Sequence, residues 1–300
     1  MHVPLIHHPA YDAVTIADGH RFPMRKYSHV AKLLRAQGHA LIEPPPARPE
    51  QLEAVHDRNY VSAVLACTLD RNVQRKIGFD VTPAIVRRTC ASVGGTLHAA
   101  RFALTTGLAV NLAGGSHHAH PETGSGFCVF NDVGVAAHAM LALGEVKKVL
   151  VVDLDVHHGD GTARMFSRRD DVFTLSIHCE DNWPLEKPSS DMDIGLPRGA
   201  TDSVYLVTLR QALSQAFDAA QPDFVFYNAG VDPHKDDKLG HLDLTDGGLL
   251  ERDRIVARAC LERTIPLCGV LGGGYSADAM AVARRHVLLV EALSGCRSLA

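Results

Sequence analysis

Residues 153–160 read Asp-Leu-Asp-Val-His-His-Gly-Asp and directly follow the apolar run Val149–Val152. Because side chains alternate between the two sides of a strand, Asp153, Asp155 and His157 are expected to face one way. Burying two carboxylates costs several kcal/mol unless a cation or hydrogen bonds compensate for the lost hydration. A bound cation is the simplest compensation, so the stretch predicts a metal site at the end of a buried strand. The alternative is a structural ion-pair site.

Short apolar runs elsewhere have the character of buried strands, and longer segments between them have helical spacing. Strands that alternate with helices indicate βαβ units and a mostly parallel sheet covered on both faces. No Pro- or Gly-rich linker divides the chain, so we expect an α/β fold with a single domain over residues 1–300. The expected strands are 3–6, 108–112, 149–152, 172–177, 224–227 and 267–271, and the expected helices are 27–37, 52–66, 84–104, 134–143, 204–219 and 249–262.

The composition excludes several classes of protein. The net charge is -4 and the lysines and arginines are scattered, so no nucleic-acid partner is expected. No apolar run reaches the length of a membrane-spanning helix, and residues 1–5 lack the features of a signal peptide. The seven cysteines form no Cys-x-x-Cys pair, which indicates reduced thiols and a cytoplasmic location. The oligomeric state stays open.

Asp232 can complete a set of metal ligands with Asp155 and His157. It opens the irregular stretch 232–248, which, like 114–127 and 179–201, follows an expected strand. Ligands bind beyond the carboxyl ends of the strands in open α/β sheets, so these stretches should converge on the mouth of one pocket. Two oxygens and one imidazole suit a catalytic zinc or iron(II) ion. Alone, an Asp-Pro pair after a strand is more often part of a turn.

Two glycine-rich motifs add further chemistry. Residues 114–118 read Gly-Gly-Ser-His-His, and a neutral imidazole of His117 or His118 could accept a proton from water beside a metal. Residues 272–275 read Gly-Gly-Gly-Tyr, which would let Tyr275 donate a hydrogen bond to a developing oxyanion. The alternatives are a solvated histidine-rich turn and a glycine-rich turn with a packing tyrosine. Asp160, likewise, could be only a helix cap.

Taken together, these motifs resemble the histone deacetylase family, which has the arginase/deacetylase fold. The resemblance implies a three-layer α/β/α architecture and spans most of the chain. The matching segments, in the order and spacing of the family, are Gly-Gly-Ser-His-His-Ala at 114–119, Gly-Phe-Cys-Val-Phe-Asn-Asp at 126–132, Asp-Leu-Asp-Val-His-His-Gly-Asp-Gly at 153–161, Asn-Ala-Gly-Val-Asp at 228–232 and Gly-Gly-Gly-Tyr at 272–275.

The resemblance implies a role for each matching residue. His118 is expected to be the general base and acid, with His117 as its electrostatic neighbour and Tyr275 as the oxyanion donor. Asp153 and Asp160 would orient the two histidines. The zinc ligands would be Asp155, His157 and Asp232, and the walls of an acyl-lysine tunnel would include Phe127, Trp183, Gly126 and Gly273.

The family also binds potassium beside the zinc. The residues that correspond to its structural K+ site are Asp153, Asp155, His157, Ser176 and Ile177. Phe166, Arg169 and Val172 fall at the spacing of a second monovalent-cation site, and Arg25 resembles the arginine of the acetate-release pocket.

Two segments are similar to the bacterial, class IV-like branch of the family: 20–24, His-Arg-Phe-Pro-Met, and 190–195, Ser-Asp-Met-Asp-Ile-Gly. The chain departs from the animal class I pattern at Ser116, where an aromatic residue is common, and in the short region 78–80. Asp80 is the candidate there for the acidic rim residue that grips the substrate backbone.

The sequence therefore predicts zinc-dependent hydrolysis of an N-acyl amine, foremost an acetylated or longer-acylated lysine side chain, with iron(II) as an alternative metal. Three rival readings remain. The substrate could be an acetylpolyamine or another small amide. The protein could be a non-catalytic acyl-lysine binding module, or an arginase-type hydrolase with two manganese ions.

Overall fold

The computed structural model describes residues 2–12, 16 and 20–298. Met1, the first residue of the segment that lacks signal-peptide features, is therefore outside the described residues. All described strands form one sheet in the order β2-β1-β3-β8-β7-β4-β5-β6. Every pairing between neighbouring strands is parallel. The strands are β1 (Leu5–Ile6), β2 (Leu41–Ile42), β3 (Leu108–Asn111), β4 (Val149–Asp153), β5 (Val172–Cys179), β6 (Met192–Leu196), β7 (Phe224–Asn228) and β8 (Leu267–Val270).

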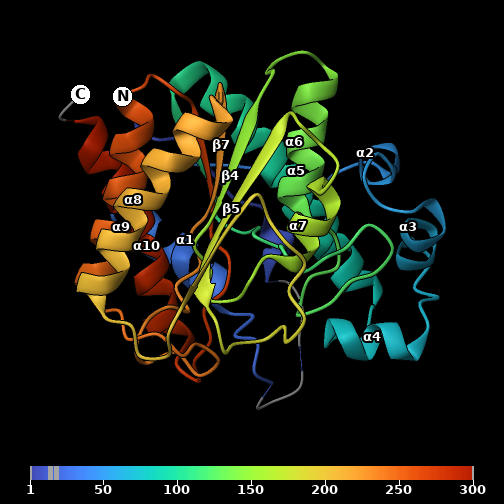
Figure 1. Cartoon of the computed structure of the whole chain (residues 1–300). Coiled ribbons are helices and arrows are strands. Elements are labelled where there is room, and N and C mark those ends of the chain that lie inside the picture. Colours follow the sequence, from blue (N-terminus) through green and yellow to red (C-terminus); the bar gives the residue numbers. More distant parts are fainter. Residues whose placement is uncertain (1, 13–15, 17–19, 299–300) are drawn as a thin grey trace.

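Helices cover both faces of this sheet, which confirms the expected three-layer α/β/α architecture (Figure 1). On one face α9 packs against α8 and α10, and α10 packs against α1; α5, α6 and α7 lie on the other face. The helices are η1 (Pro9–Tyr11), α1 (Lys26–Ala36), α2 (Pro49–Glu53), α3 (Arg58–Leu65), α4 (Arg71–Ile77), α5 (Pro83–Thr106), α6 (Asp132–Ala142), α7 (Asp160–Phe166), α8 (Asp202–Ala220), α9 (Asp246–Leu261) and α10 (Ala279–Arg297).

Burial on both faces explains why the central strands are continuous apolar runs. Every residue of β3, β4, β7 and β8 is buried. A strand between two helical layers has no solvent-facing side, so the alternation typical of a half-exposed strand is lost. In the described part of the chain, no helix combines the length and the apolarity needed to cross a bilayer.

The structure differs from the sequence-based expectation at several elements. The helix expected over 52–66 is two helices, because the Asp57 side chain accepts a hydrogen bond from the Tyr60 amide at 3.0 Å and begins α3 anew. The edge strands β2 and β6 were not predicted, since one is two residues long and the other is half-exposed. The helices α4, α7 and α10 were also not predicted.

Strand register determines where the site forms. Asp153, the last residue of β4, lies opposite Asn228 of β7 on one side and Ser176 of β5 on the other. Asn228 in turn lies opposite Val270 of β8. The segments that leave β4, β7 and β8 at their carboxyl ends therefore start side by side, which is where a parallel sheet places its ligand site.

Candidate active site

The segment that follows β4 is a tight loop and not a continued strand. β4 ends at Asp153, so strand alternation does not position Asp155 and His157, and the prediction that it does was wrong. The loop is instead folded by its own carboxylates. The Asp155 amide donates to Asp153 at 3.2 Å, and the His157 amide donates to Asp155 at 3.0 Å. Such short side-chain-to-backbone bonds are typical of aspartate-initiated turns.

Asp155, His157 and Asp232 form a compact set of buried donors whose ligand atoms all lie within 4.8 Å of one another. The Nδ1 atom of His157 lies 3.0 Å from Oδ1 of Asp155 and 3.2 Å from Oδ2 of Asp232. Oδ2 of Asp232 is buried and has no hydrogen-bond partner among the described residues. A buried carboxylate oxygen of this kind, beside a second carboxylate and an imidazole, fits a shared zinc or iron(II) ion.

Gly273 leaves the room that these carboxylates need. Its amide donates to Oδ2 of Asp155 at 2.8 Å, and a Cβ atom at this position would collide with the carboxylate oxygens of Asp155 and Asp232. The glycine-rich segment after β8 therefore allows the backbone to come close to the candidate metal ligands.

Electrostatics at the three candidate ligands favour a bound positive charge. Burial and the neighbouring Asp155 raise the pKa of Asp232 to about 7. Burial acts in the same direction on Asp155, but His117 and His157 outweigh it and hold the pKa of Asp155 well below its usual range. Burial opposes protonation of His157, yet the two carboxylates raise its pKa to about 10. Two carboxylates this close together disfavour the ionised form of one of them, and a cation bound between them would relieve this repulsion.

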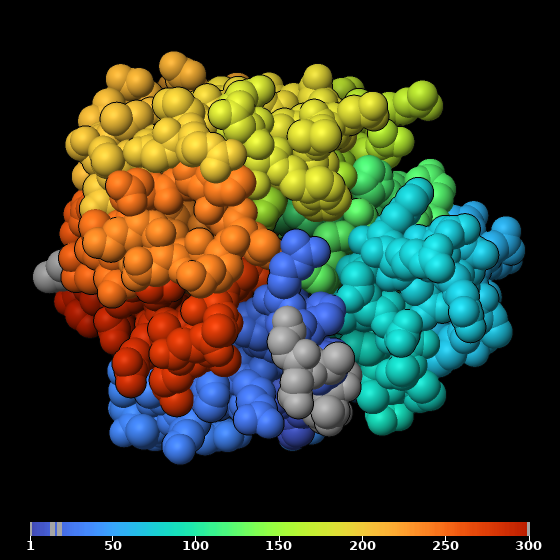
Figure 2. Space-filling view, turned by 90° about the horizontal axis from the view of Figure 1, so that it is seen from below, coloured from blue at the N-terminus to red at the C-terminus, as the bar shows by residue number. Residues whose placement is uncertain are grey.

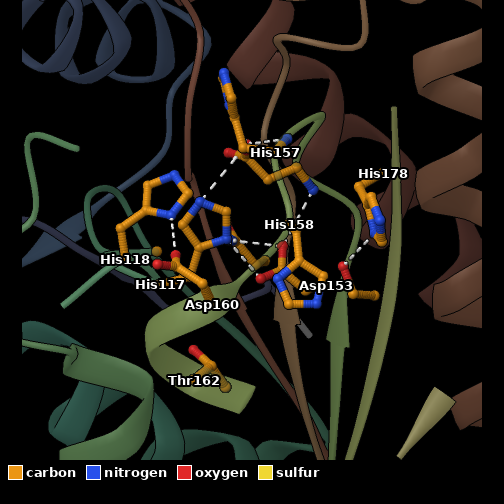
Figure 3. Close-up of polar contacts among 12 residues, drawn as sticks. His117, His118, Asp153, His157, His158, Asp160, Thr162 and His178 are labelled. Carbon is orange, nitrogen blue, oxygen red and sulfur yellow. Dashed lines mark hydrogen bonds and ion pairs between the residues drawn. The ribbon is translucent and has the colours of Figure 1, made fainter. Parts of the chain in front are cut away.

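Adjacent histidines His117 and His118 each face their own carboxylate (Figure 3). Nδ1 of His117 lies 2.6 Å from Oδ2 of Asp153, and Nδ1 of His118 lies 2.5 Å from Oδ1 of Asp160. The two ring centroids are 4.0 Å apart. Asn228 donates to the other oxygen of Asp153 at 3.0 Å, which fixes that carboxylate. The structure thus brings together the four residues that the sequence had linked as histidines and their orienting carboxylates.

The two imidazoles differ in their affinity for a proton. Burial and the neighbouring His117 lower the pKa of His118 to about 3. Burial also acts on His117, but Asp153 and Asp155 outweigh it and raise its pKa to about 9. A neutral His118 that donates Nδ1–H to Asp160 has a lone pair on Nε2, which is the form a general base requires.

Asp160 contacts a third histidine of the same sequence cluster, His120, for which no role was predicted. Nε2 of His120 lies 2.8 Å from Oδ2 of Asp160, so this carboxylate bridges His118 and His120. Despite burial, these two histidines hold the pKa of Asp160 below its usual range. Asp160 is the first residue of α7 and not its cap, which is Gly159. Its side chain therefore serves the histidines and does not close the helix end.

Tyr275 lies beside His157 and Phe127. Its ring centroid is 6.2 Å from that of His157 and 5.8 Å from that of Phe127, and its hydroxyl forms no hydrogen bond with a described residue. Burial and the nearby Asp155 carboxylate raise the pKa of Tyr275 well above its usual range, so the phenol stays a donor. The Tyr275 amide donates to Asp237 at 2.6 Å. Asp237 was missed by the sequence analysis because it is 38 residues away.

A cavity of about 520 Å³ leads from the surface to His118, His157 and Tyr275. Phe127 and Trp183 both line it, and the Trp183 ring packs edge-on against His118 at 4.5 Å between centroids. Gly126, with φ of 52°, has the left-handed conformation that favours glycine. A Cβ atom at Gly126 would approach the His118 ring to 2.6 Å and the Trp183 ring to 2.8 Å. This glycine therefore keeps the passage open.

A second, internal cavity of about 30 Å³ lies behind His117 and Tyr275. This volume holds about one small polar molecule. Arg88 lines it and is fixed by donating to the Tyr27 hydroxyl at 3.0 Å and the Tyr11 carbonyl at 2.9 Å. Arg25, expected from the sequence at an acetate-release pocket, is exposed at the start of α1 and does not line this cavity. The helical register turns Arg25 to solvent, and the buried arginine comes from α5.

The remaining expected residues take the following places. Ser176 lies opposite Asp153 in the sheet, Ile177 follows it on β5, and the Ser176 hydroxyl contacts Nδ1 of His178 at 3.0 Å. Phe166 ends α7, Arg169 lies in the following turn, and Val172 begins β5. Asp80 lines a neighbouring hollow and not the 520 Å³ cavity.

A second cluster that can hold a metal consists of His158, His178 and Asp193. Nε2 of His158 lies 2.9 Å from Oδ1 of Asp193 on β6. His158 therefore makes a different contact from its neighbour His157. It links the loop after β4 to the edge strand β6. The sequence alone gave no reason to separate the two histidines.

Arg252 supports the site from behind and was also missed. This side chain is fully buried and pairs with Asp253 at 2.8 Å. It donates to the Gly230 carbonyl at 2.5 Å and to the Leu154 carbonyl at 3.3 Å. Arg252 thus joins the loops after β4 and β7, which carry the candidate metal ligands.

Comparisons with known proteins agree with this geometry. The family model described as "Histone deacetylase domain" matches residues 20–290. An uncharacterized protein of Picosynechococcus is 44% identical over 97% of this chain and 98% of its own length. Histone deacetylase 2 of Arabidopsis thaliana is 31% identical over 91% of this chain and 74% of its own. The crystal structure of an HDAC homolog from Aquifex aeolicus, 26% identical, superposes with a TM-score of 0.84 and covers 98% of this chain and 84% of that one. The chain belongs to the histone deacetylase family.

Proposed function

We propose that this protein hydrolyses the amide of an acylated lysine side chain in a metal-dependent reaction. The observation that carries the proposal is the pairing of His117 and His118, each with its own buried carboxylate, beside a three-donor metal set. Both histidines line one cavity with Asp155 and Tyr275. His118, the candidate ligand His157 and Tyr275 all line the 520 Å³ cavity, so the general base, the metal and the oxyanion donor would act on the same substrate group.

Asp155, His157 and Asp232 would hold the metal, with zinc or iron(II) as the ion that the donor set fits. When bound, such an ion polarises a carbonyl and makes water more acidic. Asp153, Ser176 and the loop after β4 would hold a structural potassium ion.

The chain's own residues carry the proton and the charge. His118, with Nδ1 held by Asp160, accepts a proton from the attacking water on Nε2 and returns it to the leaving amine. Tyr275 donates its free hydroxyl to the oxyanion as the carbonyl carbon becomes tetrahedral. His117, fixed by Asp153, stands beside the reacting atoms and stabilises the same negative charge.

The two cavities fit the two parts of the substrate. The acyl-lysine chain lies between Phe127 and Trp183, with its amide beside Tyr275. The acyl group then points toward the internal cavity, where the Arg88 guanidinium can bind the carboxylate product. At about 30 Å³ this cavity suits an acetyl group better than a long acyl chain.

The rival functions have less support. A binding module would not need the free Tyr275 hydroxyl or the Asp160–His118 pair. An arginase-type site would need a carboxylate to bridge a second metal ion, whereas Asp153 is engaged by His117 and Asn228.

The test is turnover of acetyl-lysine peptides, longer acyl-lysine peptides and acetylpolyamines by protein loaded with zinc or with iron(II), next to chelator-treated protein. We expect hydrolysis of the acetyl-lysine peptide that the chelator abolishes and added metal restores. Metal-loaded protein that binds these peptides without cleaving any of them would establish the binding module instead.

A further inference from the structure

Lysine and arginine are the charged residue types among the described residues that line the 520 Å³ cavity. The described residues that line it include four lysine or arginine side chains and no aspartate or glutamate. All four are exposed. They come from the segment before α1, from α4 and from the loop after β7, and these distant segments meet around the hollow on the face shown in Figure 2. The four residues, called here the basic rim, are Arg21, Arg75, Lys76 and Lys238.

The side chains of the basic rim are not paired with carboxylates of the described residues. Within the described part of the chain, none of its four side chains forms an ion pair, and the one hydrogen bond they make is from Arg75 to the neutral Asn72 at 3.2 Å. Elsewhere on the surface, arginines do find carboxylates, as Arg210 does with Glu251 and Arg285 with Asp236. The chain as a whole has a net charge of -4, so the rim opposes the overall charge. A cleft lined by one sign of charge attracts ligands of the opposite sign.

We propose that the substrates carry carboxylates next to the scissile acyl-lysine, as in an acidic peptide segment, and that lysine- and arginine-rich tails and acylated polyamines are disfavoured. This inference rests on the proposed function, since it names the substrate class of the same site. A peptide fits better than a small anion because the rim cations lie on three separate segments around the opening, so several anions can be matched at once.

The expected size of the preference follows from the exposure of the rim. An ion pair between exposed side chains changes an affinity roughly 1.4- to 5-fold. Two or three such pairs give a ratio on the order of 10 in kcat/KM between an acidic and a neutral peptide. Because exposed charges are screened, the ratio should shrink at high salt.

The test uses three peptides in which acetyl-lysine is flanked on both sides by Glu, by Gln or by Lys, assayed at about 20 and about 500 mM NaCl. We expect kcat/KM to fall in the order Glu, Gln, Lys at low salt and to converge at high salt. The Gln peptide measures the proposed function by itself, because its flanks are neutral. Failure to cleave any of the three peptides would refute the proposed function, whereas equal cleavage of all three would refute only the acidic-substrate inference.

A charge-reversal pair locates the effect. Lys76→Glu with Lys238→Glu should remove or invert the preference, measured in each protein as the ratio of kcat/KM for the Glu and Lys peptides to kcat/KM for the Gln peptide. The matched control is Lys147→Glu with Lys148→Glu, which changes the net charge equally at the opposite end of β4. Loss of the preference in the control variant would overturn the assignment of this preference to the basic rim. An unchanged preference in the Lys76→Glu, Lys238→Glu variant would overturn it too. Faster turnover of an acetylpolyamine or of free acetyl-lysine than of the Glu peptide would overturn it as well.

Discussion

The protonation of His56 should control acid stability. This side chain is 3% exposed and lies between α2 and α3. Its Nδ1 donates to the His120 carbonyl, and its Nε2 accepts from the Asn131 amide, each at 3.0 Å. Only the neutral tautomer with a proton on Nδ1 makes both bonds. His56 thereby links the two ends of segment 120–131, which contains Phe127 of the cavity wall.

The magnitude follows from the shift in pKa. Burial lowers the pKa of His56 from 6.5 to about 4. The folded protein binds this proton more weakly than the unfolded chain, so the stability is complete above pH 6.5 and is lost as the pH falls toward 4. A difference of about 2.5 pKa units corresponds to ~3.4 kcal/mol at full titration and to ~2 kcal/mol at about pH 5.

The assay is the free energy of unfolding in urea at about pH 7.5 and about pH 5, with a chelator present so that metal binding does not contribute. The wild type should lose ~2 kcal/mol more between the two pH values than His56→Gln does. The variant's own destabilisation cancels, because each protein is compared with itself. His2→Gln, at an exposed position, controls for the loss of a histidine. Equal losses in the wild type and His56→Gln would show that the protonation of His56 does not control acid stability.

Three further predictions concern the active site. Tyr275→Phe should lower kcat roughly 10²- to 10³-fold, the scale for one oxyanion donor, with metal content unchanged; near-normal turnover would remove Tyr275 from the mechanism. His118→Ala should abolish turnover of an acetyl-lysine peptide while the metal stays bound, and loss of metal in elemental analysis would mean that His118 is a ligand. Gly273→Ala should lower the metal content, because its Cβ would displace Asp155 and Asp232; full metal occupancy would contradict the close approach drawn from the structure.

Local sequence was enough to predict the central strands and the candidate ligands. Runs such as 149–152 and 224–227 are apolar because both faces of the sheet are covered, and this signal is contained in a few consecutive residues. The ligands lie directly beyond those runs, so the order of strands and polar residues pointed to one edge of the sheet. Elements with weaker local signals, such as the half-exposed β6, were not recognised.

The parallel α/β sheet could therefore be predicted from short apolar runs, and the Asp155–His157–Asp232 set and the histidine pair from short motifs that follow strands. The side chains that surround these motifs could not be predicted and follow from the folded structure. It placed Arg88 rather than Arg25 at the internal cavity. It also gathered the basic rim from three segments. The physical reason is that a contact between distant segments depends on how whole helices and loops pack, and no local pattern of residues records that packing.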